Sequence, residues 1–147
     1  MTEQKRIMVI HGPNLNMLGQ REPGVYGTAT LDDINAMLLQ RAAEKDLVVE
    51  TFQSNHEGAL VDKIQAAAGV VSGMIINPAA FTHTSVAIKD ALLLLLDVPV
   101  IEVHISNVYK REPFRHVSMV SDVVTGKIVG LGVNGYTLAL DALAEMV

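Results

Sequence analysis

Short apolar runs alternate with amphipathic stretches along this chain, and the alternation predicts strands and helices in turn. The first run, Ile7-Met8-Val9-Ile10, leads into a polar loop. A helical pattern follows, which Thr30 is placed to cap and which continues to about Lys45. The same order then repeats. The later strands are predicted at 47–52, 71–76, 100–103 and 126–129, and the later helices at 58–68, 84–96 and 136–146.

Strands that alternate with helices pair in parallel through right-handed crossovers, which places helices on both faces of one sheet. Five strands in this rhythm predict an α/β fold, a flavodoxin-like three-layer sandwich with a five-stranded parallel sheet of order 2-1-3-4-5. The length of 147 residues lies within the usual range of one domain. We therefore expect a single domain over residues 1–147.

The predicted helix at 84–96 is apolar around most of its circumference. Between Val86 and Leu96 only Lys89 and Asp90 are charged, and five leucines follow one another. One sheet face of a small α/β domain does not cover such a helix, so we expect the remaining apolar surface to contact another subunit. A helix wrapped by its own chain is the alternative.

The charge pattern limits the classes of partner. The formal net charge is −5 and the lysines are scattered, so the chain has no basic surface that indicates nucleic acid or an anionic membrane. The first ten residues are too polar at their start for a signal peptide, and the apolar run ending at Leu96 is too short for a membrane span. The chain has no cysteine, which excludes disulfides and thiolate metal sites. We expect a cytoplasmic protein that binds neither nucleic acid nor membrane.

Polar side chains follow the predicted strands, at the edge where open α/β sheets bind their ligands. A single histidine after a strand is most often a structural group. Here four of the five histidines hold equivalent positions, which indicates a site. The polar groups after the four strands are His11 and Asn14, then Ser54-Asn55-His56, then Asn77 and His83, and then His104 with Ser106 and Asn107.

Three of the five arginines lie in segments without helix or strand periodicity. Guanidinium groups in loops suit a carboxylate or hydroxyl ligand, so we expect a small anionic substrate. Arg21 belongs to the polar loop after the first strand. We interpret Arg111 as a solvated surface charge and Arg115, which lies between Phe114 and His116, as the better candidate.

Several chemistries lack their sequence signals. No glycine-rich nucleotide loop follows the first strand, the histidines lack the spacing of a metal cage, and no Gly-x-Ser-x-Gly turn presents a nucleophile. Lys110 stands beside Arg111, where a desolvated amine that could form a Schiff base is not expected. Acid–base chemistry by a phenol and an imidazole remains, and the loop at 11–27 carries Asn14, Arg21 and Tyr26.

These residues form ordered motifs, and with them the chain resembles the type II 3-dehydroquinate dehydratases from Ile7 to about Leu143. The motifs are Gly12-Pro13-Asn14-Leu15-Asn16 with Leu18-Gly19, Arg21-Glu22-Pro23 with Tyr26-Gly27, Gln53-Ser54-Asn55-His56-Glu57-Gly58, Asn77-Pro78-Ala79 with Thr82-His83-Thr84-Ser85, Glu102-Val103-His104-Ile105-Ser106-Asn107, Arg111-Glu112-Pro113-Phe114-Arg115, and Gly130-Leu131-Gly132 with Gly135-Tyr136.

The resemblance implies the reversible dehydration of 3-dehydroquinate to 3-dehydroshikimate through an enolate, with no metal, cofactor or imine. Such an enzyme serves the shikimate pathway or quinate breakdown. By resemblance Tyr26 is the general base. A phenol is ordinarily protonated at neutral pH, and the positive charge of Arg21 would favour the phenolate. Asn14 would help to hold the oxygen or water that carries enolate charge.

By the same resemblance His104 is the general acid, and Glu102 orients or charges it. The substrate carboxylate is expected on the backbone amides of Ile105 and Ser106 and on the amide of Asn77. The ring hydroxyls are expected on His83 and Arg115. Asp90 is expected to reach the site of a neighbouring subunit in a trimer, and four trimers would form a homo-dodecamer.

The chain departs from the family pattern at three positions, where it carries His11, Val117 and Met119. Asparagine is commoner in the family at the first, and histidine and tyrosine at the other two. None of the three is a proposed catalytic position.

Two alternatives have different expected signals. A flavodoxin-like module that binds FMN or a small anion without chemistry needs phosphate-cradling Ser, Thr and Gly amides after the first strand and flanking aromatic rings. This loop instead supplies Arg21 and Tyr26, and the chain has no tryptophan. An inactive homologue that acts as a scaffold would be expected to lack the base or the acid, and Tyr26 and His104 are both present.

Overall fold

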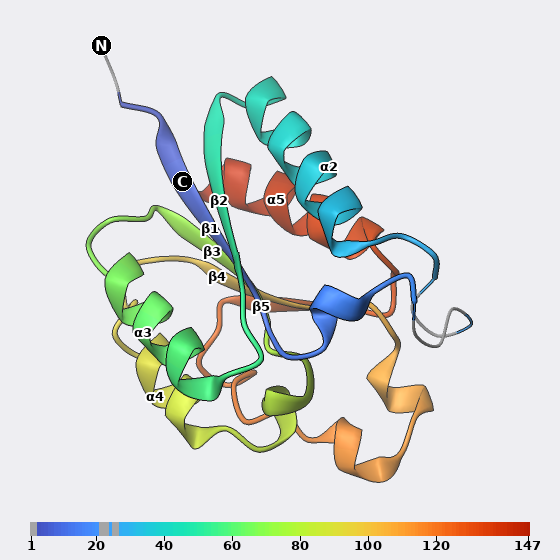
Figure 1. Ribbon diagram of the computed structural model, residues 1–147. Coiled ribbons are helices and arrows are strands. Elements are labelled where there is room, and N and C mark those ends of the chain that lie inside the picture. Colours follow the sequence, from blue (N-terminus) through green and yellow to red (C-terminus); the bar gives the residue numbers. More distant parts are fainter. Residues whose placement is uncertain (1–2, 21–23, 25–26) are drawn as a thin grey trace.

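A five-stranded parallel sheet forms the centre of the computed structural model, which describes residues 3–20, 24 and 27–147 (Figure 1). The strands follow the order β2-β1-β3-β4-β5, and all four neighbouring pairs are parallel. The predicted strand order is confirmed. The strands are β1 (Lys5–His11), β2 (Leu47–Gln53), β3 (Gly73–Asn77), β4 (Val100–His104) and β5 (Gly126–Val129).

Helices cover both faces of the sheet. Figure 1 shows α2 (Leu31–Glu44) and α5 (Asn134–Met146) together on one face, and α3 (Glu57–Ala67) and α4 (Val86–Leu92) together on the other. Alternate residues of the inner strand β1 contribute to the two cores: Ile7 and Val9 pack on the first side, Met8 and Ile10 on the second. This alternation follows from the two-residue period of a strand.

The start of α2 agrees with the sequence prediction. The Thr30 side chain accepts a hydrogen bond from the Asp33 backbone N–H at 3.1 Å, and the Asp33 carboxylate accepts one from the Thr30 N–H at 2.9 Å. This reciprocal capping box satisfies two donors that the first turn of a helix leaves without partners.

The helix predicted at 84–96 is shorter than expected. It begins after Ser85, whose hydroxyl accepts from the Ile88 N–H, and it ends at Leu92. The following residues close tighter turns, with N–H to C=O bonds from Leu94 to Ala91 and from Leu95 to Leu92. A three-residue spacing in these turns keeps Leu92 and Leu95 both in the core.

The rest of the leucine run is exposed in this chain. Val86, Leu93 and Leu94 are about half exposed, and Leu96 is 82% exposed. The alternative of a helix wrapped by its own chain is therefore wrong. The expected contact with another subunit stays a prediction.

The loop that follows β1 packs closely against the loop that follows β3. A Cβ atom added to Gly12 would lie 2.4 Å from the Pro78 carbonyl oxygen, so only glycine fits there. The Gly12 N–H donates to the Asn77 carbonyl at 2.8 Å. Together these contacts fix the start of the polar loop against the end of β3. Among the described helices, none is both long and apolar enough to span a bilayer.

Candidate active site

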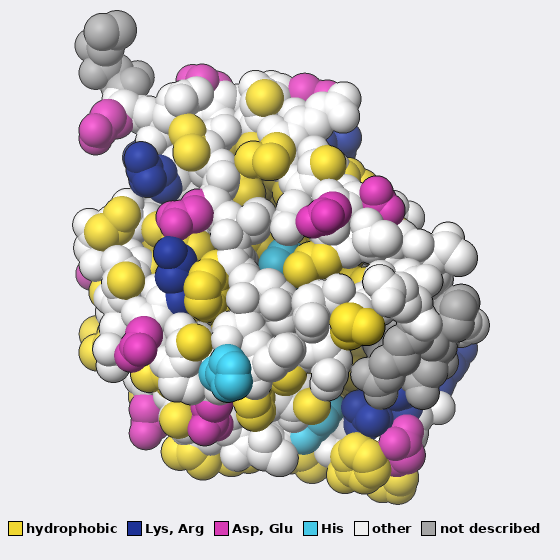
Figure 2. Space-filling model, in the orientation of Figure 1, with side chains coloured by type: hydrophobic (Ala, Val, Ile, Leu, Met, Phe, Trp, Pro, Cys, Tyr) yellow, Lys and Arg dark blue, Asp and Glu magenta, His cyan; other side chains and the backbone are white. Residues whose placement is uncertain are grey.

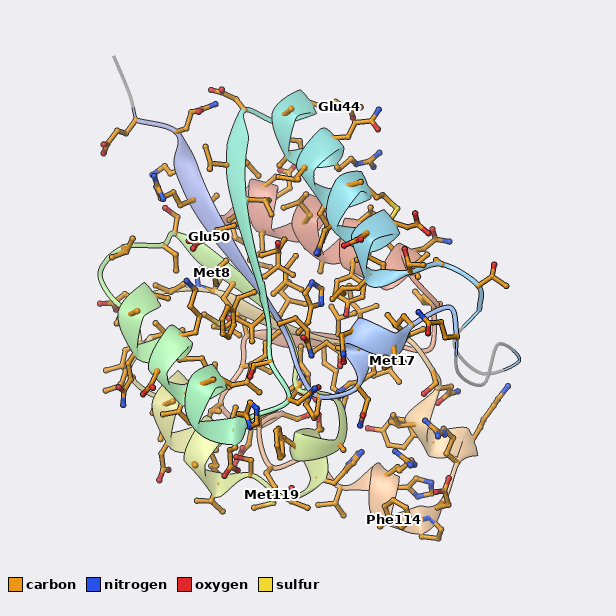
Figure 3. The ribbon with its side chains drawn as sticks, in the orientation of Figure 1. Met8, Met17, Glu44, Glu50, Phe114 and Met119 are labelled. Atoms are coloured by element: carbon orange, nitrogen blue, oxygen red, sulfur yellow. The ribbon has the colours of Figure 1, made fainter. Side chains whose placement is uncertain are left out.

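A pocket lies at the carboxyl ends of β1, β3 and β4, where the sequence predicted a site. Figure 3 shows that the turn carrying Met17 and the turn carrying Phe114 lie at this same end of the sheet. In Figure 2, basic, histidine and hydrophobic side chains gather over the corresponding part of the surface. The lining residues are Pro13, Asn14, Leu15, Met17, Leu18, Asn77, Ala79, Ala80, His83, His104, Ile105, Ser106, Val108, Arg111 and Arg115.

The structure gathers most of the predicted site residues in this pocket. Seven of them line it: Asn14, Asn77, His83, His104, Ile105, Ser106 and Arg115. Glu102 lies behind His104 and is fully buried. Asp90 is exposed on α4 and does not line the pocket of its own chain. Arg21 and Tyr26 lie outside the described residues.

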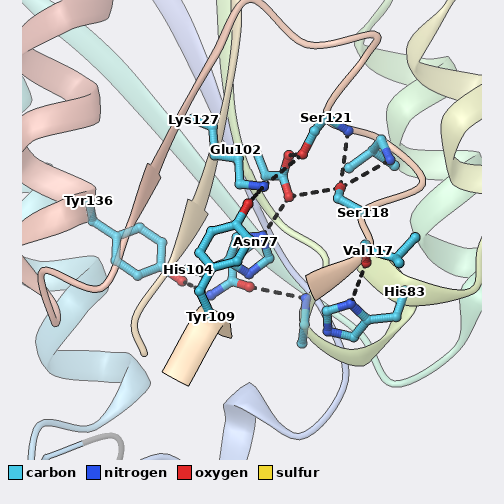
Figure 4. Close-up of polar contacts among 12 residues, drawn as sticks. Asn77, His83, Glu102, His104, Tyr109, Val117, Ser118, Ser121, Lys127 and Tyr136 are labelled. Atoms are coloured by element: carbon cyan, nitrogen blue, oxygen red, sulfur yellow. Dashed lines mark hydrogen bonds and ion pairs between the residues drawn. The ribbon is translucent and has the colours of Figure 1, made fainter. Parts of the chain in front are cut away.

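Two residues of β4 form a buried acid–base pair. Glu102 and His104 are two positions apart, so their side chains project from the same face of the strand. The His104 Nε2 lies 2.5 Å from a Glu102 carboxylate oxygen (Figure 4). Because an ionised carboxylate only accepts, Nε2 carries the proton and donates it to Glu102. Within the described part of the chain no hydrogen bond occupies Nδ1, which is left for a ligand in the pocket.

Further donors surround the Glu102 carboxylate. The hydroxyls of Ser121 and Ser118 donate to it at 2.6 and 3.2 Å, and Lys127 Nζ donates to the Ser121 hydroxyl at 3.0 Å (Figure 4). We call these five residues, His104, Glu102, Ser118, Ser121 and Lys127, the charged chain.

The charged chain keeps Glu102 ionised despite its burial. Burial alone would raise the pKa of Glu102, but hydrogen bonds from His104 and Ser121 and the charges of His104 and Lys127 outweigh it. The pKa of Glu102 is therefore lowered from its ordinary value. The result is a negative charge held at a fixed place behind the imidazole.

His83 presents an acceptor to the pocket. Its Nδ1–H donates to the Val117 carbonyl at 2.7 Å (Figure 4). Burial lowers the pKa of His83, the Val117 bond opposes the change, and the charges of His104 and Arg115 lower the pKa further. His83 is thus neutral at neutral pH, with a lone pair on Nε2 that can accept from a hydroxyl. Val117, one of the three departures, contributes here through its backbone.

Donors for an anion lie at the end of β4. Ile105 and Ser106 line the pocket. No hydrogen bond among the described residues uses the backbone N–H of either one. Asn77 is 3% exposed and also lines the pocket. Its Nδ2 donates to the Tyr136 hydroxyl at 2.9 Å, which leaves one N–H of the amide for a ligand.

The loop after β2 fixes the position of Asn14. The Asn14 N–H donates to the Asn55 side-chain oxygen at 2.9 Å, and Gln53 Nε2 bonds both that oxygen and the Gly12 carbonyl. Asn14 has φ of 69°, in the left-handed region that asparagine tolerates better than most residues. These bonds hold an amide side chain at the pocket wall.

A comparison with protein families decides the identity of the fold and site. A family model described as Dehydroquinase class II matches residues 5–144. The chain belongs to the class II dehydroquinase family.

Individual relatives are similar to this chain over nearly its whole length. A protein of Roseiflexus castenholzii named 3-dehydroquinate dehydratase is 59% identical over 138 residues, which cover 94% of this chain and 87% of that protein. A catabolic 3-dehydroquinase of Penicillium rubens is 61% identical over 137 residues, 93% of this chain and 88% of its own. The crystal structure of the type II dehydroquinase from Butyrivibrio crossotus superposes with a TM-score of 0.93 at 48% identity, covering 95% of this chain and 97% of that one.

The interpretation of Arg111 as a solvated surface charge is wrong for this dehydroquinase. Arg111 lines the pocket, its side chain is only 16% exposed, and it donates to the Ser106 hydroxyl at 3.3 Å. Among the described residues, two guanidinium groups therefore line the pocket, from Arg111 and from Arg115. Arg115 Nε lies 3.3 Å from both oxygens of the Glu112 carboxylate. Arg111 follows the short 3-10 turn Val108–Lys110, only five residues after Ser106, and this proximity along the chain was the signal for its place in the pocket.

Two of the four histidines that suggested a site do not line it. His56 is exposed and precedes α3. His11 is fully buried, and its two ring nitrogens face Asn35 and Tyr136. Only His83 and His104 line the pocket. In the described part of the chain no group of three His, Asp or Glu side chains is placed to hold a metal ion.

Proposed function

We propose that this dehydroquinase removes water from 3-dehydroquinate to give 3-dehydroshikimate, through an enolate intermediate and reversibly. Family membership supports the reaction class. The buried Glu102–His104 pair is the observation that carries the proposal. It faces a pocket where the described residues supply two guanidinium groups and two backbone N–H groups that no described residue accepts from. We expect the enzyme to act in the cytoplasm, in the shikimate pathway or in quinate breakdown.

The first step removes a proton from the carbon next to the ketone. We propose Tyr26 as the base, in its phenolate form, with Arg21 as the charge that favours that form. The proton moves to the phenolate oxygen and the electron pair moves into the enolate. Asn14, which lines the pocket, would hold the oxygen or water on which this charge collects.

The second step breaks the bond between carbon and the departing hydroxyl. We propose that the protonated His104 gives its Nδ1 proton to that oxygen, so that water leaves and the enolate electrons form the new double bond. Glu102 accepts the Nε2–H throughout, which orients the ring and gives its charged form a partner. Tyr26 and His104 then return to their starting protonation states through solvent.

Substrate binding uses the remaining groups of the pocket. We propose that the substrate carboxylate accepts from the backbone N–H groups of Ile105 and Ser106 and from the second N–H of Asn77. His83 would accept a hydrogen bond from a ring hydroxyl through Nε2, and Arg115 would donate to another.

Assembly completes the site in this proposal. Asp90 is exposed on α4 beside the exposed apolar residues Val86, Leu93 and Leu94. In a trimer, a neighbouring subunit would cover this apolar surface, and Asp90 would extend toward the substrate bound by that neighbour. Four such trimers would form a dodecamer.

A direct assay tests the proposal. The purified protein is mixed with 3-dehydroquinate, and the ultraviolet absorbance of the conjugated product is followed from pH 6 to 9. We expect a rise in the wild-type protein and a loss of about 10²-fold or more in Tyr26→Phe, which keeps the ring and loses the ionisable oxygen. No rise at any pH would overturn the reaction, and near-normal turnover by Tyr26→Phe would remove that residue from the base role.

Borohydride distinguishes this mechanism from an imine mechanism. No lysine is among the described residues that line the pocket. Treatment with borohydride in the presence of substrate should therefore leave activity intact. Irreversible loss together with a substrate-sized mass increase on a lysine would contradict the acid–base mechanism.

A further inference from the structure

A second set of hydrogen bonds runs from the pocket into the core between the sheet and the helices α2 and α5. Asn77 Nδ2 donates to the Tyr136 hydroxyl at 2.9 Å, and that hydroxyl lies 3.3 Å from His11 Nδ1. His11 Nε2 lies 2.9 Å from the Asn35 side-chain oxygen. These four residues, which we call the neutral chain, come from β3, α5, β1 and α2. None of them except Asn77 lines the pocket.

The direction of every bond in the neutral chain is determined. The Asn35 oxygen can only accept, so His11 Nε2 carries the proton and donates. Burial lowers the pKa of His11 from 6.5 to about 4, with the Asn35 bond opposing the change, so Nδ1 has no proton at neutral pH. Nδ1 therefore accepts from the Tyr136 O–H. The Tyr136 oxygen in turn accepts from Asn77.

Burial makes this direction difficult to reverse. His11 and Tyr136 are both 0% exposed, and their rings pack with centroids 5.4 Å apart. Burial also raises the pKa of Tyr136, against a smaller opposing effect of the Asn77 bond, so its hydroxyl keeps its proton. A buried donor or acceptor that lost its partner would carry the full cost of desolvation.

The far end of the Asn77 amide is fixed as well. Its side-chain oxygen accepts from the Ala79 N–H at 3.0 Å, and Ala79 has φ of 54°. One bond thus holds the amide oxygen and the Tyr136 bond holds the amide nitrogen. These two hydrogen bonds together fix the direction of the second N–H of the Asn77 side chain.

We propose that Tyr136 and His11 are positioning residues that hold the Asn77 amide with its second N–H toward the substrate carboxylate. This inference rests on the proposed function. It assigns a role in binding to two buried residues that touch no substrate. His11 acts through Tyr136, and Tyr136 acts through Asn77.

Steady-state kinetics of the full-length protein test the proposal. Tyr136→Phe removes only the hydroxyl, and we expect the KM for 3-dehydroquinate to rise about tenfold, the equivalent of one hydrogen bond, while kcat changes less than about twofold. His11→Leu should give the same rise. His11→Asn should keep a KM near the wild-type value, because its amide oxygen can replace Nδ1 as the acceptor for Tyr136.

A double-mutant cycle separates positioning from general damage. If Tyr136 acts through Asn77, Tyr136→Phe adds nothing to the KM of Asn77→Ala. Leu143→Val, a core change on the same helix α5, serves as the control for lost stability and should leave KM unchanged. Additive effects in the cycle, or a wild-type KM in Tyr136→Phe, would overturn the positioning role.

The two proposals fail in different ways. If the wild-type protein gives no turnover, the proposed function fails. If the wild-type protein is active and the KM rise in Tyr136→Phe is matched by Leu143→Val, only the positioning role fails. Imidazole nitrogen NMR gives a readout without turnover: His11 should show a protonated Nε2 and a bare Nδ1 at pH 7, and a protonated Nδ1 would contradict the chain direction.

Discussion

The charged chain and the neutral chain both support pocket residues from behind, but they differ in what they hold fixed. The charged chain surrounds an ionised Glu102 with His104, two serine hydroxyls and, through Ser121, Lys127. The neutral chain has no formal charge and passes from Asn77 through Tyr136 and His11 to Asn35. In the proposed mechanism, one chain places a group that exchanges protons, and the other places a group that only donates a hydrogen bond.

The difference follows from the cost of burying charge. A buried carboxylate is stable only when charged partners and hydrogen bonds offset its desolvation, so the charged chain needs several donors at once. A buried amide and phenol need only one partner for each donor or acceptor. Residues that change protonation during turnover therefore require a charged surrounding, whereas a binding amide can be held by groups that are neutral at neutral pH.

The largest effect is expected from Glu102→Gln. The amide keeps a hydrogen-bond acceptor at nearly the same place but removes the charge that accompanies a protonated His104. We expect kcat to fall about 10²- to 10⁴-fold with a smaller change in KM. Steady-state kinetics with 3-dehydroquinate measure kcat and KM of the variant and of the wild type. A kcat within a factor of about three of wild type would show that the negative charge of Glu102 is not used in catalysis.

An intermediate effect is expected on stability at acid pH, from His11. Its pKa is about 4 in the folded protein and ordinarily 6.5, so between these values the unfolded chain binds a proton that the folded protein excludes. The free energy of unfolding should therefore fall as the pH is lowered from 6.5 toward 4, by about 3 kcal/mol in all, and this contribution is fully present above pH 6.5.

His11→Asn isolates that contribution, because asparagine does not titrate. Urea unfolding of wild type and His11→Asn at several pH values between 7 and 4 measures the difference. We expect the variant to lose less stability than wild type over this interval. Parallel curves for the two proteins would contradict the burial of a neutral His11.

The smallest effect is expected from Lys127→Met. The charge of Lys127 is the last of the contributions that lower the pKa of Glu102, so its removal raises that pKa. Glu102 is then protonated at a higher pH, so the acid limb of the plot of kcat against pH moves to higher pH. We expect a loss of a few fold at the acid end and almost none at pH 8. Lys63→Met, which removes a lysine paired with Glu50 on β2, is the matched control and should leave the profile in place.

Lys127→Met also sharpens the comparison of the two chains. The stability that Glu102 gains from its lowered pKa is present above its ordinary value and is lost as the pH falls through the folded value. Lys127→Met should lose it at a higher pH than wild type. The tautomer of His11, read by NMR, should be the same in both proteins. A change at His11 would mean that the chains are coupled.

Periodicity in the sequence was sufficient to predict the sheet and most helices, because each strand and helix buries a face that its own residues define. The sequence also predicted the N-cap at Thr30, and the family resemblance implied the pairing of Glu102 with His104. Both contacts join residues two or three positions apart. The end of α4 at Leu92 could not be predicted from the sequence. The tighter turns after Leu92 depend on which leucines the neighbouring sheet can bury.

The amino-acid sequence by itself determined the strand order, the edge of the sheet where the site lies, and the types of group available there. Only the tertiary structure decided that Arg111 lies in the pocket, that His56 does not, and that His11 is buried. The bond between His11 and Tyr136 joins residues 125 positions apart, and the bond from Asn77 to Tyr136 spans 59. Local propensities contain no information on such pairs. Buried polar groups must find partners wherever the packed elements bring them, and the packing of α2 and α5 beside β1 and β3 made these partners neighbours.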